Sequence, residues 1–101
     1  MLIYNITSKV AWPVQEQWIE WMMMEHMVEV LETGLILKYQ LVRLQEVDDV
    51  DGPTFAVQYY IEGRPQYELY IQKFAPALRQ KMIDRWGDQV ISFHTLMEVI
   101  N

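Results

Sequence analysis

Residues 18–31 form the longest apolar-rich run in the chain, and this run constrains the fold more than any other feature. Pro13 lies just before it and suits the first turn of a helix, where the missing amide costs no hydrogen bond. Gly34 lies just after it and easily adopts the left-handed conformation that commonly ends a helix. The pattern predicts a helix from residue 12 to about residue 32, with an apolar side that a sheet must cover.

The remaining segments predict the order β-α-β-β-α-β. Alternating apolar residues indicate strands over residues 2–9, 35–47, 54–62 and 89–100. A second helix should begin near Pro65, break near residues 74–75 because Pro76 removes an amide and clashes with the preceding turn, and end at residues 86–87. We therefore predict an α+β protein with the ferredoxin-like arrangement, a four-stranded antiparallel sheet with two helices on one face. At 101 residues the chain should form a single domain spanning residues 1–101.

The charge and composition exclude several classes of function. The formal net charge of −6 disfavours nucleic acid and anionic membrane surfaces as partners. The chain has no cysteine, so it can form neither disulfides nor thiolate metal sites. No apolar run approaches the ~20 residues that cross a bilayer, and the start lacks the features of a signal peptide. We expect a cytoplasmic protein with no nucleic-acid or membrane partner, and no phosphate loop or metal-ligand spacing points to a cofactor.

The face of the sheet opposite the helices should be polar in a monomer, but the sequence gives it a mixed character. In residues 54–62, Ala56, Gln58 and Tyr60 alternate with a strongly apolar set. Residues 35–47 carry apolar side chains on both faces. The last strand alternates two sets, which are Ser92, His94, Leu96 and Glu98, and Ile91, Phe93, Thr95, Met97 and Val99. A mixed face suits a protein interface, so we predict a homodimer in which two sheets pack face to face.

Several short segments together resemble a known family. They are Ile3-Tyr4-Asn5, Glu25-His26, Leu31-Glu32-Thr33-Gly34, Phe55-Ala56-Val57-Gln58-Tyr59, Ala75-Pro76-Ala77-Leu78-Arg79 and Phe93-His94-Thr95-Leu96. The pattern resembles a family of short bacterial proteins of unknown function that is similar to the dimeric α+β-barrel superfamily. The resemblance implies the fold and the dimer but no activity. This chain has His94 where the family more often has Arg, and we assign His94 no role.

His26 is the most interesting polar residue of the first predicted helix. At ~100° per residue, one side of a regular helix carries Ile19, Met22, Met23, His26, Met27 and Val30, and the other carries Glu25, Glu29 and Glu32 with Trp18 and Trp21 toward it. His26 should therefore face the sheet. A core histidine with satisfied hydrogen bonds is the commoner explanation. The alternative is a cavity residue that binds a ligand or moves a proton, since histidine titrates near neutrality.

Two hypotheses of function follow. In the first, a dimeric α+β-barrel protein binds a small organic molecule between helices and sheet around His26, and whether it is an enzyme stays open. Candidate wall or anchoring residues are Trp18, Met22, Arg43, Tyr59 and Asn5. Some haem-degrading barrels of the superfamily use a strand-one Asn with a helix-two His, but residues 65–86 contain no histidine. In the second hypothesis the protein is a non-enzymatic homodimeric interaction module without a ligand. A solidly packed His26 with both ring nitrogens satisfied would favour the second.

Overall fold

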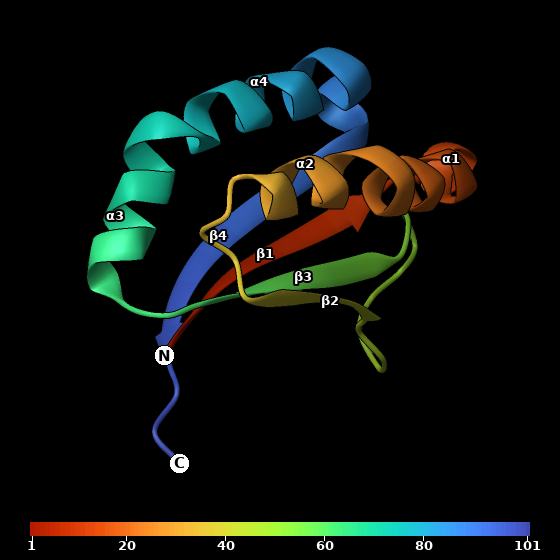
Figure 1. The fold of residues 1–101 in the computed structure, drawn as a ribbon. Coiled ribbons are helices and arrows are strands. Elements are labelled where there is room, and N and C mark those ends of the chain that lie inside the picture. The colour runs from red at the N-terminus through yellow and green to blue at the C-terminus, as the bar shows by residue number, and fades with distance from the viewer.

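The computed structural model describes residues 1–101 and contains one four-stranded sheet. The elements are β1 (Leu2–Val10), η1 (Trp12–Val14), α1 (Gln15–Trp21), η2 (Met22–His26), α2 (Met27–Glu32), β2 (Lys38–Arg43), β3 (Thr54–Ile61), α3 (Arg64–Lys73), α4 (Ala75–Trp86), η3 (Gly87–Gln89) and β4 (Val90–Glu98). The strands pair antiparallel in the order β2-β3-β1-β4. All helices lie on one face of this sheet (Figure 1). The predicted ferredoxin-like fold is confirmed.

The helix boundaries follow the proline and glycine signals, whereas the second strand does not reach its predicted length. Gly34 ends α2 with a φ of 78°, and α3 gives way to α4 at Phe74, with Pro76 in the first turn of α4. β2 covers only Lys38–Arg43 instead of residues 35–47. Ile36 is buried in the core as the chain crosses from α2 to the sheet, so its apolar character serves this connection rather than strand pairing.

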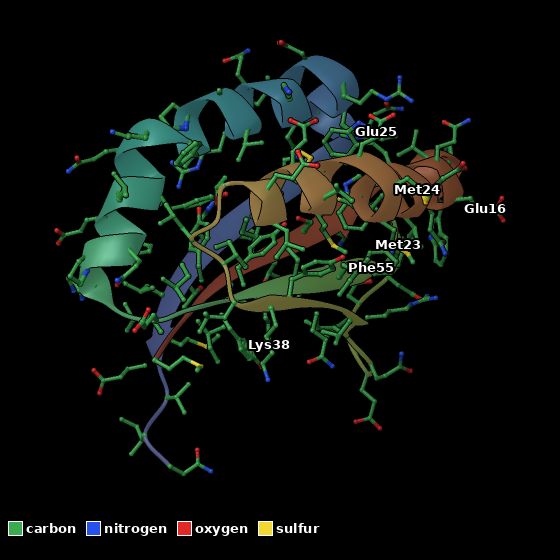
Figure 2. All side chains as sticks on the ribbon, in the orientation of Figure 1. Glu16, Met23, Met24, Glu25, Lys38 and Phe55 are labelled. Carbon is green, nitrogen blue, oxygen red and sulfur yellow. The ribbon has the colours of Figure 1, made fainter.

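The first helix contains a π-helical turn that the sequence analysis did not foresee. In η2 the amide of Met27 donates to the carbonyl of Met22, five residues earlier. In a regular helix Trp18 and Met27 would lie about 180° apart, but here both are buried, with 1% and 3% exposure. Two predicted orientations are therefore wrong. Trp18 faces the sheet and not the glutamate side, and Met23 is 53% exposed, like its neighbour Met24 (Figure 2).

The core lies between the helices and one face of the sheet. It includes Tyr4 and Val10 from β1 and Val57, Tyr59 and Ile61 from β3. No helix of the molecule is both long enough and apolar enough to span a bilayer.

The register of β4 decides which of its two alternating sets faces the helices. Ser92 pairs with Ser8 and Leu96 with Tyr4, so the set that contains His94 lies on the helix side. The more apolar set lies on the open face, where Ile91 is 56% and Phe93 67% exposed. Lys38 of β2 also projects from this open face (Figure 2).

Candidate functional site

A cavity of about 240 Å³ lies between the helix side of β1 and β4 and the helices above them. Eight of its thirteen lining residues are hydrophobic, with Tyr4 and Tyr70 included, and four of the eight come from α4. The polar lining side chains are Tyr4, His26, Tyr70, Arg79, Ser92 and His94. The cavity is thus mainly apolar, with polar groups contributed by five different elements.

Three of these polar side chains form one hydrogen-bonded network on the cavity wall. Nη2 of Arg79 donates to the hydroxyl of Tyr4 at 2.7 Å, and the same hydroxyl is hydrogen-bonded to Nδ1 of His94. The ring of Tyr4 is held by edge-to-face contacts with Tyr67 and Tyr70, with ring centroids 5.8 and 5.9 Å away. Burial raises the pKa of Tyr4, so the phenol keeps its proton at neutral pH.

His94 and Arg79 differ in charge at neutral pH. Partial burial, and then the positive charge of Arg79, lower the pKa of His94. The imidazole is therefore uncharged at neutral pH, while an arginine is always charged in proteins. No Asp or Glu lines the cavity, so Arg79 is the only charged group there.

His26 reaches the cavity from η2. Its ring stacks on Trp21, with centroids 4.7 Å apart and an interplanar angle of 23°. The residue is 5% exposed, and its Nδ1 is buried without a hydrogen-bond partner. Burial lowers the pKa of His26 to about 4; Lys81 acts in the same direction and Glu29 against it. His26 is thus a neutral imidazole at pH 7, and its Nδ1 is not satisfied as it would be in an ordinary core histidine.

Of the residues predicted to bind a ligand, His26 alone lines the cavity. Trp18 and Met22 lie on the same helix but pack into the core, Trp18 against Phe55 at a centroid distance of 5.1 Å. Tyr59 is fully buried beside Tyr4 and does not line the cavity.

Arg43 and Asn5 lie away from the cavity. Arg43 is exposed on β2 and lies over the ring of Trp12, 5.8 Å from its centroid. Asn5 points to the open face of the sheet, where it pairs with Gln58 across the strands and donates to Oγ1 of Thr7 at 3.0 Å. The helix face of β1 presents Tyr4 instead, so Asn5 cannot act on a molecule held between the helices and the sheet.

Sequence reasoning missed Arg79, Tyr4, Tyr70 and His94. Tyr4 belonged to the predicted inward alternation of its strand, but nothing in a single strand indicates a partner for its hydroxyl. Arg79 directly follows the buried Leu78, a weak sign that it borders the core. His94 could be assigned to the site only through the register with β1, which places it opposite Ile6.

Comparison with known proteins gives a family and a fold. The family model described as "Domain of unknown function (DUF4286)" matches residues 1–100, in agreement with the resemblance noted in the sequence. No curated protein shows a significant match to this chain.

Solved structures with similar folds have low sequence identity. A protein of the EthD family from Bacillus halodurans C-125 has a TM-score of 0.72 at 10% identity, covering 99% of this chain and 100% of its own. A dimeric ferredoxin-like protein from an uncultured marine organism has a TM-score of 0.65 at 13% identity, with 99% and 96% coverage. A protein from Deinococcus radiodurans described as an antibiotic biosynthesis monooxygenase has a TM-score of 0.63 at 15% identity, with 100% and 94% coverage.

Proposed function

This chain belongs to the DUF4286 family, and from its own geometry we propose that it binds a small organic molecule in the cavity beneath α4. The observation that carries this proposal is the cavity itself, which is mainly apolar but is bordered by the hydrogen-bonded network of Arg79, Tyr4 and His94. Ligand sites are typically concave and apolar with a few polar groups that fix orientation. Because typical sites enclose about 300–1,000 Å³, a cavity of about 240 Å³ suits a molecule of one or two rings.

The state of His26 supports the same proposal. A buried nitrogen without a partner costs roughly 1–3 kcal/mol, and an ordinary core histidine avoids this cost. His26 instead borders the cavity with Nδ1 unpartnered. The place of His26 on the cavity wall is what supports the ligand hypothesis, since Trp18, Tyr59 and Trp86 also bury an unpartnered polar atom within the packed core.

The proposal is tested by blocking the cavity. Ile83 lines it and is 59% exposed, so Ile83→Trp should fold and fill the space. Leu69→Trp is the matched control, since Leu69 is 38% exposed on α3 and does not line the cavity. Toluene and indole titrated against the ¹⁵N-labelled protein should shift amides around the cavity in the wild type and the control, but not in Ile83→Trp. Shifts that persist in Ile83→Trp would contradict the proposal.

A homodimer through the open sheet face is the second part of the proposal. Ile91 and Phe93 expose apolar surface there, in a row with Thr95, and one structural neighbour is described as a dimeric ferredoxin-like protein. Phe93→Asp should give a monomer in sedimentation at micromolar concentration. Val50→Asp should leave the assembly unchanged, because Val50 is 79% exposed in the loop before β3. A wild-type protein that sediments as a monomer would exclude the dimer.

The interaction module without a ligand is the second candidate function, and the same exposed pair, Ile91 and Phe93, favours it. A dimer that binds neither toluene nor indole would support this candidate over the first. The proposed cytoplasmic location applies to both candidates and rests on the sequence.

A further inference from the structure

We propose that the ligand is an organic acid whose anionic oxygen is bound at Arg79 and His94. This inference rests on the proposed ligand-binding function and adds the chemical class of the ligand. It comes from the charge of the cavity, from the direction of its hydrogen-bond donors and from the apolar character of the remaining wall.

The charge in the cavity is opposite to that of the protein as a whole. The chain has 14 acidic and 8 basic residues, yet the lining contains Arg79 and no acidic residue. The ion pair that the molecule does form joins Lys81 to Glu29, outside the cavity. Arg79 has no carboxylate partner and donates only to the neutral hydroxyl of Tyr4. A guanidinium has five N–H donors, so most of them are available to a ligand.

The hydrogen-bond directions make this end of the cavity a donor site. The oxygen of Tyr4 accepts from Arg79, and we assign the one proton of Tyr4 to the bond with Nδ1 of His94, which then accepts it. A neutral imidazole that accepts at Nδ1 carries its hydrogen on Nε2. The two groups left to meet a ligand are therefore the guanidinium and an imidazole N–H. A carboxylate only accepts hydrogen bonds and pairs well with a guanidinium.

The apolar lining residues indicate the chemical character of the rest of the acid. Leu78, Met82 and Val90 line the cavity beyond its polar end. His26 adds an uncharged imidazole that does not repel or attract an anion strongly. An aromatic or branched aliphatic carboxylic acid combines the apolar body and the anionic group that this arrangement fits.

The test compares three molecules of similar shape, namely benzoate, benzamide and toluene, by NMR titration of the full chain. Arg79 is exposed, and an exposed ion pair contributes about 0.2–1 kcal/mol, so the wild type should bind benzoate up to about fivefold more tightly than benzamide. Arg79→Met should remove this preference without weakening toluene binding, and Arg79→Lys should keep part of it. Arg85→Met is the matched control, because Arg85 lies on the same helix but over Trp86 and outside the cavity.

Each outcome separates the two proposals. Equal affinity for benzoate and benzamide, with toluene binding that Ile83→Trp abolishes, would overturn the organic acid and leave the ligand-binding function standing. A benzoate preference that survives in Arg79→Met would also overturn the inference. No binding of any of the three molecules up to about 10 mM would overturn both.

Discussion

Arg79 donates a hydrogen bond from Nη2 to the hydroxyl of Tyr4 at 2.7 Å, which links α4 to the first strand of the sheet. The same hydroxyl is bonded to His94, so one oxygen connects a helix with two neighbouring strands.

Tyr4→Phe should lower the free energy of unfolding by about 0.5–1.5 kcal/mol, since it removes this oxygen, while its two partners are exposed and can bond to water. Tyr67→Phe should change it by less than about 0.5 kcal/mol, because Tyr67 contacts the ring of Tyr4 but forms no side-chain hydrogen bond. Urea denaturation measures both. Equal losses in the two variants would show that the ring, and not the hydroxyl, makes the contribution.

Stability should fall when the pH is lowered from 7 to 5, in part because of His26. The pKa of this residue is about 4 in the folded state and about 6.5 in the unfolded chain, so the unfolded chain binds more protons between these values. The contribution is fully present above pH 6.5 and is lost as the pH falls toward 4, which gives a loss of about 2 kcal/mol between pH 7 and 5.

His26→Gln, which cannot titrate, should remove this part of the pH dependence. Glu29 and Lys81, whose charges act on His26 in opposite directions, remain in the variant, as does His94, whose pKa is also lowered. The difference between the two denaturation profiles therefore isolates His26. Parallel profiles would show that His26 does not stay neutral in the folded state.

Tyr59→Phe should stabilise the protein by about 1 kcal/mol. The hydroxyl of Tyr59 is fully buried without a hydrogen-bond partner, and its removal recovers the cost of burying it. Tyr39→Phe is the control, since Tyr39 lies opposite Tyr59 on β2 but is only half-buried. Thermal unfolding should show a higher midpoint for Tyr59→Phe and a midpoint near that of the wild type for Tyr39→Phe. A lower midpoint for Tyr59→Phe would mean that its hydroxyl is hydrogen-bonded in solution.

Deletion of Met24 should leave the fold intact and convert the π turn into regular α-helix. Met24 is 71% exposed within η2. Without it, the buried residues of the helix follow the spacing i, i+4, i+7, i+8 and i+11, which places them on one face. Deletion of Val28, beyond the π turn, should instead rotate the end of α2 by about 100° and expose Val30. Circular dichroism and thermal unfolding distinguish the two deletion variants. Similar losses of helicity and stability in both would argue against Met24 as the extra residue that causes the π turn.

The order of elements could be predicted because proline and glycine mark the helix ends and the strands alternate clearly. The π turn could not, because a helical wheel assumes a constant rotation per residue, and this assumption misplaced Trp18 and Met23. The orientation of β4 could not either, since its more apolar set faces away from the helices, and only the pairing with β1 shows this.

The candidate site was only partly predictable for a related reason. His26 was identified from a pattern within one helix. The partners of Tyr4 depend on strand register and on the rotation of α4, and these are properties of the assembled molecule. No local spacing in the sequence predicts that Arg79 and His94 both bond to the hydroxyl of Tyr4.

Tyr4 and His94 are 90 residues apart in the chain, and the strands that carry them are neighbours in the sheet. Protein synthesis therefore delivers Tyr4 well before His94. Until β4 leaves the ribosome, the edge of β1 stays unpaired and Arg79 faces a phenol that has no second partner. Contacts between distant parts of a chain form slowly, so the polar end of the cavity should be among the last parts of the molecule to become ordered, and a fragment that lacks β4 should not contain it.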